Sequence, residues 1–123
     1  MSMKNVSCYQ NVNPYITKDG SIIRELMHPA NHAVINQSMA EAIVPVGQVT
    51  KAHKHIVTEE IYFIVEGEGQ MTLADEQFNV YGADSICISP GTLHCIRNTG
   101  VIPLRILCCC SPAYSDEDTV LVD

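Results

Sequence analysis

The sequence has few basic residues and lacks long apolar segments, and both shortages exclude whole classes of function. Seven Lys and Arg residues stand against fourteen Asp and Glu residues, which gives a formal net charge of −7. The largest basic group is the pair Lys51 and Lys54, so nothing would neutralise a run of phosphates, and we expect no nucleic-acid partner. No apolar run approaches the roughly 18 residues of a membrane span. We therefore expect no membrane partner either.

Charged residues of both signs are scarce, at 17%, whereas apolar residues make up 46% of the 123 positions. This balance argues against disorder. The length suits one domain with a core of its own and is too short for two. Residues 1–10 are polar and lack the apolar centre of a signal peptide, so we expect a cytoplasmic protein.

The six cysteines do not form a disulfide pattern. Three are consecutive, Cys108 to Cys110, and neighbours in a strand point to opposite faces. Without a secretion signal, reduced thiols are the better interpretation. The spaced pairs of a thiolate metal site are also missing, so we interpret the run 107–110 as small apolar filling in a buried strand.

Glycine and proline interrupt the chain at short intervals, and the runs between them favour strands. Turn signals every 8–12 residues predict an all-β sandwich or barrel. The segment 38–44 also has apolar residues at helical spacing, but Pro45 and Gly47 close it after seven residues, which favours a strand. The predicted strands are 21–26, 38–44, 60–66, 70–74, 78–81, 85–89, 93–98 and 102–110.

Three of the five histidines lie where they could share a ligand. His53 and His55 are two positions apart, so a strand would place both on one face. Glu60 opens the next strand, and His94 follows a distant turn. These four side chains can converge on one divalent metal ion. His53 and His55 taken alone are as well explained by a solvated turn.

The spacing around the first three of these residues resembles the first motif of the cupin family. That motif is Gly, five residues, His-x-His, three or four residues, Glu, six residues and Gly. Here Gly47 is followed by five residues, then His53 and His55, then four residues, Glu60, six residues and Gly67. Every element of the motif is present.

The second cupin motif is matched at its end and not at its front. It runs Gly, five residues, Pro-x-Gly, two residues, His, three residues and Asn. Gly91, His94 and Asn98 fit the end, whereas Ala83 and Ser89 replace the first glycine and the proline. These departures affect scaffold positions and leave the histidine in place.

The resemblance implies a double-stranded β-helix, a jelly-roll-like barrel. It further implies one divalent transition metal ion held inside by His53, His55, Glu60 and His94. Such a donor set accepts Fe, Mn, Ni, Co, Cu or Zn and does not select among them. On this basis we predict a single cupin domain over 1–123, with an N-terminal arm 1–37, a barrel 38–110 that carries both motifs, and an acidic tail 111–123.

Strand parity decides which side chains face the lumen. Glu59 competes with Glu60 as the ligand, but only Glu60 keeps the spacing to Gly67. An inward Glu60 makes Tyr62 inward as well, and Tyr62 is the candidate catalytic residue, as a hydrogen-bond donor to a bound ligand. For Tyr62 itself, a core aromatic with a satisfied hydroxyl is the favoured interpretation, and the role as a donor is the alternative. Lys51 shares the parity of His53, although a solvated lysine is the favoured interpretation.

The same alternation applies to the strand that carries His94. An inward His94 carries Asn98 inward, where we favour a role in capping the turn that follows. Arg97 points away, and no inward carboxylate besides Glu60 is apparent. This weakens an oxalate-decarboxylase-like function, which would need a cationic anchor for a dianion. His28 and His32 have no motif around them and are expected in solvent.

The resemblance leaves the reaction open, because this fold carries many functions. We expect a metal-dependent enzyme acting on a small polar molecule, a sugar or a carboxylate, as an isomerase, a dioxygenase or a decarboxylase or lyase. The alternative is a non-catalytic binding or sensor protein that uses the same metal. A purely structural metal is disfavoured, because structural sites close their coordination sphere. The predicted strand 21–26 leaves a sheet edge, which a second copy would cover in a homodimer.

Overall fold

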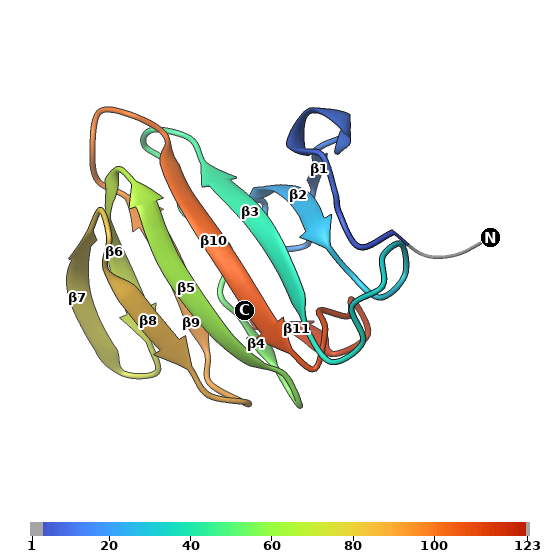
Figure 1. The fold of residues 1–123 in the computed structure, drawn as a ribbon. Coiled ribbons are helices and arrows are strands. Elements are labelled where there is room, and N and C mark those ends of the chain that lie inside the picture. The colour runs from blue at the N-terminus through green and yellow to red at the C-terminus, as the bar shows by residue number, and fades with distance from the viewer. Residues whose placement is uncertain (1–3, 123) are drawn as a thin grey trace.

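The computed structural model describes residues 4–122 and consists almost entirely of strands in two antiparallel sheets (Figure 1). The larger sheet contains β1 (Tyr15–Ile16), β2 (Ile22–Met27), β3 (Ser38–Val44), β5 (Glu59–Glu66), β8 (Ser85–Ile88) and β10 (Leu104–Ser111). The smaller sheet contains β4 (His53–His55), β6 (Glu68–Leu73), β7 (Glu76–Tyr81), β9 (His94–Asn98) and β11 (Thr119–Leu121). One turn of 3-10 helix, η1 (Tyr9–Asn11), precedes them.

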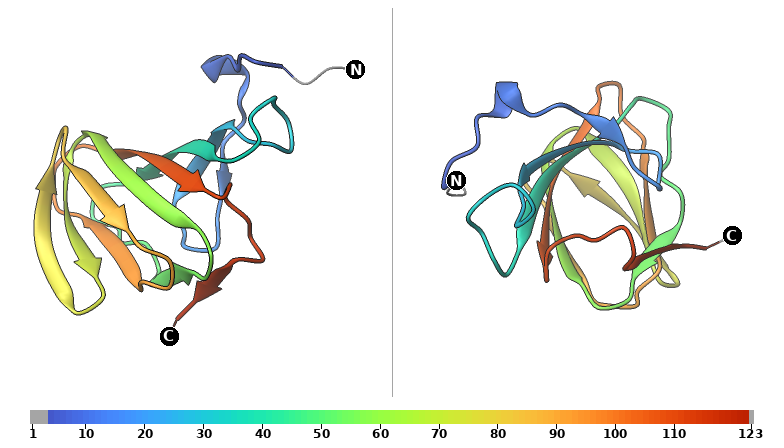
Figure 2. Two further views of the ribbon diagram at one scale, coloured as in Figure 1. Left: turned by 60° about the horizontal axis from the view of Figure 1, so that its bottom comes forward. Right: turned by 90° about the vertical axis from the view of Figure 1, so that its right-hand side faces the viewer.

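The strand order shows a jelly-roll barrel rather than a simple meander. The larger sheet runs β1-β2-β3-β10-β5-β8, and the smaller runs β11-β4-β9-β6-β7. Strands distant in sequence, such as β3 and β10, therefore lie side by side, and Figure 2 shows the two sheets facing each other around the lumen. The predicted all-β jelly-roll barrel is confirmed.

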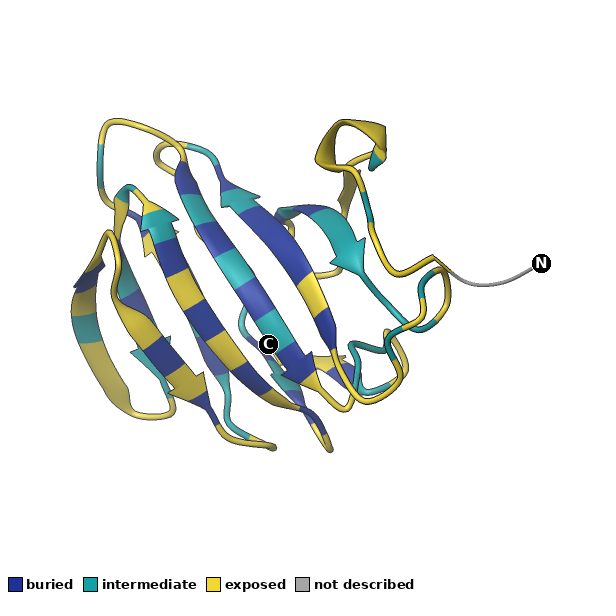
Figure 3. Ribbon diagram, viewed as in Figure 1, coloured by how far each residue is buried: buried dark blue, intermediate teal, exposed yellow. Residues whose placement is uncertain are grey.

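Alternating side chains explain why the strands form and where the core lies. Along β5, Tyr62 and Ile64 are buried, whereas Ile61 and Phe63 are exposed. The same alternation runs along β10, as the banding in Figure 3 shows. The apolar core fills the lumen between the sheets, with fully buried side chains that include Ile64, Met71, Ile88, Ile96, Leu104 and Ile106.

The N-terminal segment is part of the larger sheet, which differs from the predicted arm. β2 pairs with β3 along most of its length, and β1 pairs with the other side of β2 through Tyr15 and Ile16. The expected open edge on the strand 21–26 is therefore partly covered by the chain itself. The two-residue β1 was too short to be recognised from the sequence.

The C-terminal segment is likewise more than the acidic tail that we expected. Thr119–Leu121 forms β11, which pairs with β4. Asp118 accepts hydrogen bonds from the backbone N–H groups of Val57 and Thr58, at 2.9 and 3.0 Å. An acidic run predicts a solvated tail, but here one carboxylate satisfies backbone donors at the start of β5.

A non-glycine residue takes a left-handed conformation at the position where the sequence departs from the cupin pattern. Ala83, which replaces the first glycine of the second motif, has φ 75°. Its N–H donates to the backbone carbonyl of Ile64 at 2.7 Å, and this contact holds the turn. The turn therefore survives the substitution, at the steric cost of a Cβ in this region.

Two further predictions concern the chain as a whole. All six cysteines lie among the described residues and all are free, which agrees with reduced thiols. Within residues 4–122 no helix is long and apolar enough to cross a membrane.

Candidate metal centre

Each of the four predicted ligands is placed by a strand that lines the lumen. His53 and His55 occupy both ends of β4, and His94 opens β9 directly opposite His53. Glu60 projects from β5 in the opposing sheet. Their exposed fractions are 3%, 4%, 0% and 5% for His53, His55, His94 and Glu60. The barrel thus buries four ligand-type side chains that are up to 41 positions apart.

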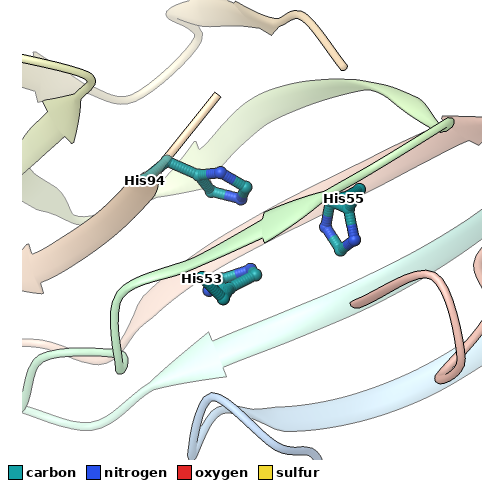
Figure 4. Close-up of side chains that lie close together, drawn as sticks. All are labelled: His53, His55 and His94. Atoms are coloured by element: carbon teal, nitrogen blue, oxygen red, sulfur yellow. The ribbon is translucent and has the colours of Figure 1, made fainter. Parts of the chain in front are cut away.

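The three imidazoles converge, as Figure 4 shows. One ring nitrogen from each of His53, His55 and His94 lies within 4.8 Å of the others. Glu60 Oε1 lies 3.1 Å from Nε2 of His55 and 3.5 Å from Nε2 of His94. The carboxylate therefore contacts two of the three rings from the facing sheet.

Backbone carbonyls fix two of the rings. Nδ1 of His53 lies 2.9 Å from the carbonyl oxygen of Lys51, and Nδ1 of His94 lies 2.9 Å from that of Thr92. A carbonyl only accepts, so both Nδ1 atoms carry the hydrogen. In the neutral imidazole, Nε2 then presents a lone pair to the lumen.

A hydroxyl from the C-terminal segment fixes the third ring. Nδ1 of His55 lies 3.0 Å from Thr119 Oγ1, which itself lies 2.9 Å from the carbonyl oxygen of Ser115. Thr119 has one hydrogen, and it is donated to that carbonyl. His55 Nδ1 is therefore the donor, and its Nε2 also presents a lone pair.

The converging atoms are acceptors without a hydrogen to share, which suits a bound cation. His94 Nε2 is buried and has no hydrogen-bond partner. Burial lowers the pKa of His53, and the neighbouring His94 adds to this effect, so His53 stays neutral at neutral pH. Glu60 Oε1 faces Nε2 of His55 at 3.1 Å and Nε2 of His94 at 3.5 Å, and because all three atoms are acceptors, a shared cation would reconcile them. One carboxylate and three imidazoles form a donor set that fits a divalent transition metal ion.

Cys110 holds the other oxygen of Glu60. Its Sγ lies 3.4 Å from Glu60 Oε2 and is the donor. Burial raises the pKa of the Cys108 and Cys110 thiols, and the negative charge of Glu60 adds to this effect. Both therefore remain protonated, which agrees with a filling role rather than a thiolate site.

The register of β5 is as predicted. Glu60 is buried and Glu59 is exposed, and Tyr62 follows Glu60 into the lumen. The Tyr62 ring lies 6.0 Å from that of His94, centroid to centroid. Burial raises the pKa of Tyr62, and the charge of Glu60 adds to this effect. The phenol keeps its proton and can donate it in a hydrogen bond.

Several secondary predictions can now be compared with the structure. Lys51 is exposed and does not line the cavity. Asn98 caps the following turn, since its amide donates to the carbonyls of Val44 and Ile102 and accepts from the N–H of Gly100, each at 2.9 Å.

The expectation of solvated His28 and His32 was wrong. Both are half-buried, with His28 Nε2 2.8 Å from the carbonyl oxygen of Tyr114 and His32 Nδ1 accepting from the N–H of His28. His32 braces its own loop, His28 also joins that loop to the C-terminal segment, and neither lines the cavity.

Sequence reasoning missed two carboxylates and two tyrosines of the cavity. The volume of this cavity is about 50 Å³. Besides His53, His55, Glu60 and Tyr62, its wall includes other residues from the two terminal segments, namely Asp19, Glu25, Tyr15 and Tyr114. The Asp19-Gly20 pair signals a turn, but no local pattern indicates that this turn faces the lumen.

Asp19 is the missed residue nearest the histidines. Its Oδ2 lies 3.7 Å from Nε2 of His53, and 13% of its side chain is exposed. Its Oδ1 accepts from the Thr17 hydroxyl at 2.7 Å, the Ser21 hydroxyl at 2.6 Å and the Ser21 N–H at 2.9 Å. The expectation that Glu60 is the sole inward carboxylate was therefore wrong.

Comparison with known sequences gives the same architecture. The family model described as "Cupin domain" matches residues 40–110. An uncharacterised protein of Methanocaldococcus jannaschii is 56% identical over 115 residues, which cover 94% of this chain and 92% of that protein. A mannose-1-phosphate guanylyltransferase of Escherichia coli is 37% identical over 62 residues, half of this chain but only 13% of that enzyme.

Solved structures resemble the barrel over nearly its whole length. Pac13, described as a unique nucleoside dehydratase, superposes with a TM-score of 0.78 at 16% identity, covering 98% of this chain and 92% of its own. A predicted oxalate decarboxylase of Thermotoga maritima gives 0.76 at 22% identity, with 87% and 98% covered. At these identities the likeness establishes the fold alone.

Proposed function

Because the chain belongs to the cupin family, we propose that it is a metal-dependent enzyme that acts on a small polar molecule held in the barrel. One observation carries this proposal. Three buried imidazoles bring ring nitrogens within 4.8 Å of one another, and each Nδ1 is held by a carbonyl or hydroxyl oxygen, which leaves Nε2 for a ligand. A core histidine has no need of such an arrangement, because a neighbouring donor or acceptor satisfies it.

His53, His55, Glu60 and His94 would hold one divalent transition metal ion. Fe, Mn, Ni, Co, Cu and Zn all accept this donor set. When bound, such an ion supplies Lewis acidity or a coordination position for a substrate. Four protein ligands would leave positions open on a six-coordinate metal ion, which favours a catalytic or ligand-binding site, whereas they would close a tetrahedral zinc site.

The chain's own residues would position the substrate. Tyr62 keeps its proton and can donate a hydrogen bond into the cavity from a fixed place beside His94. Cys110 holds one oxygen of Glu60, so the other faces His55 and His94. The apolar wall excludes bulk water, which strengthens each of these polar contacts.

The comparisons support an enzyme without naming its reaction. The structural relatives include a nucleoside dehydratase, which was also solved with uridine, and a predicted oxalate decarboxylase. The alternative function is non-catalytic binding of a small ligand through the same metal. The small volume of the cavity suits non-catalytic binding and catalysis equally.

Turnover distinguishes the two functions. The metal-loaded protein is incubated with neutral sugars, nucleosides and hydroxy acids, and the mixtures are followed by proton NMR. We expect at least one compound to be converted by the wild type and by Glu59→Gln, and not by His94→Ala. Binding of a compound without conversion would instead favour the non-catalytic function.

A further inference from the structure

The cavity is lined by more negative than positive charge. Its charged residues are Asp19, Glu25, Glu60 and Lys18, and none of the lining residues is an arginine. Asp19 and Glu60 contact the histidines, with carboxylate oxygens 3.7 Å from His53 Nε2 and 3.1 Å from His55 Nε2. A divalent ion among the histidines would be roughly balanced by these two carboxylates, which leaves no net charge to attract an anion.

The one cationic side chain of the cavity wall is already engaged. Lys18 Nζ donates to the carbonyl oxygens of Asp116 and Thr119, at 2.8 and 2.9 Å. It also lies 3.4 Å from a carboxylate oxygen of Asp116. These contacts direct the ammonium group toward the C-terminal segment, where it does not serve as an anchor for a carboxylate or phosphate in the lumen.

Asp19 is held rigidly with one oxygen unused. Its Oδ1 takes all three donors from Thr17 and Ser21. Its backbone carbonyl accepts the N–H of Lys51 at 2.7 Å, which fixes the loop against the start of β4. Oδ2 is left facing His53 Nε2 at 3.7 Å.

His53 does not satisfy that oxygen. Its hydrogen is on Nδ1 and is donated to the carbonyl of Lys51, so Asp19 Oδ2 and His53 Nε2 are both acceptors. A carboxylate oxygen in this position can accept an O–H or N–H donor from water or from a molecule in the cavity. It would repel the carboxylate or phosphate group of an anionic molecule in the same place.

We propose that Asp19 selects the charge class of the ligand: its Oδ2 accepts a hydrogen bond from an uncharged molecule that bears hydroxyl or amide groups, and it disfavours carboxylates and phosphates. This inference rests on the proposed metal-dependent function. Of the two ligand classes considered, a sugar and a carboxylate, it favours the uncharged sugar.

A matched pair of probes tests the role of Asp19. Glycolate and glycolamide share a hydroxyl and a carbonyl oxygen, but glycolate is an anion and glycolamide has N–H donors. Their affinities for the cobalt-loaded protein are measured from the visible absorption of Co²⁺ and by calorimetry. The variants are Asp19→Asn and Asp19→Ala, with Asp75→Asn as the control, since Asp75 is exposed and outside the cavity.

Both Asp19 variants should shift the ratio of the two affinities toward glycolate by about tenfold or more, because a fixed negative charge has been removed from beside the probe. The control should change the ratio by less than about twofold. An unchanged ratio in the Asp19 variants, or no binding of either probe to the wild type, overturns the proposal.

Two further outcomes separate this inference from the proposed function. If the Asp19 variants lose the cobalt absorption while the wild type and Asp75→Asn keep it, Asp19 is a metal ligand and its role in selecting the ligand's charge is refuted. Absence of cobalt binding by the wild type would refute the metal-dependent function itself.

Discussion

Thr119 Oγ1 lies 3.0 Å from His55 Nδ1, and the two residues are 64 positions apart in the sequence. The contact exists because β11 pairs with β4, with Thr119 directly opposite His55. Thr119 is 5% exposed and passes its own hydrogen to Ser115. The C-terminal segment therefore sets the tautomer of a proposed metal ligand.

Thr119→Val should weaken metal binding about 10- to 100-fold, because outer partners of a ligating histidine orient the ring and raise its basicity. Competition with a chromophoric chelator measures this affinity. Thr119→Ser keeps the hydroxyl and should restore most of it.

Thr92 provides the control for this change. Its backbone carbonyl, and not its side chain, accepts from His94, so Thr92→Val should leave the metal affinity unchanged. Equal metal affinities for the wild type and Thr119→Val would show that the Thr119 hydroxyl does not support metal binding.

Replacing Glu60 or its neighbour Glu59 tests which carboxylate binds the metal ion. Glu60→Gln removes a charged group from a buried cluster of metal-binding type, so it should cost several kcal/mol of metal binding, by analogy with the roughly 3–5 kcal/mol for breaking a buried ion pair. Glu59→Gln changes an exposed side chain and should cost about 0.5 kcal/mol of folding stability or less. Thermal stabilisation by added metal measures both. Retention of that stabilisation by Glu60→Gln contradicts the assignment.

Glu41 provides a test of stability outside the cavity. It lies on the outer face of β3 with only 1% exposed. Its carboxylate accepts from the Tyr9 hydroxyl at 2.6 Å, from Arg24 at 3.2 Å and from Arg105 at 2.6 Å. Burial alone would raise the pKa of Glu41, but these partners outweigh it and lower the pKa. The cluster joins η1, β2, β3 and β10.

Glu41→Gln should lower the free energy of unfolding at pH 7 by about 1–3 kcal/mol, less than a fully buried pair because both arginines are partly exposed. A depressed pKa stabilises the folded state above the unfolded pKa near 4.3, and this stability is lost as the pH falls through the folded value. Urea denaturation at pH 7 and pH 3 should therefore show the difference from wild type shrinking in acid. An equal difference at both pH values would contradict the argument.

The outer face of the larger sheet gives a physical basis for the predicted homodimer. Met39, Cys109, Ile61 and Cys87 lie in one row across β3, β10, β5 and β8. Ile61 is 47% exposed and Met39 37%, and an apolar row of this kind is typical of an interface.

Light scattering at micromolar concentration should give twice the 13.5 kDa mass of the monomer. Ile61→Asp should reduce it to the monomer. Val101→Asp, at a position 92% exposed in a loop, should not. A monomeric wild type would count against the dimer.

The barrel and the histidine cluster could be predicted because their signals are local or have fixed spacing. Alternation along the strand 60–66 gave the burial of Tyr62 and Ile64, and the spacing from Gly47 to Gly67 chose Glu60 over Glu59. These depend on the two-residue period of a strand, which tertiary structure does not change.

The two terminal segments could not be placed in this way. β1 has two residues and β11 has three, too few for any period to be recognised. Asp19 and Thr119 reach the site through pairings with distant strands, and a turn or an acidic run indicates nothing about what it will contact. The second carboxylate of the cavity was missed for this reason.

The metal content of the purified protein and of His94→Ala tests the central claim most directly. The wild type, His28→Ala and His32→Ala should each contain about one divalent ion per chain, because neither control histidine belongs to the cluster of His53, His55 and His94. His94→Ala removes a buried ring whose Nε2 has no other partner, and it should contain little or none. Full metal content in His94→Ala, or none in the wild type after reconstitution, would contradict the account.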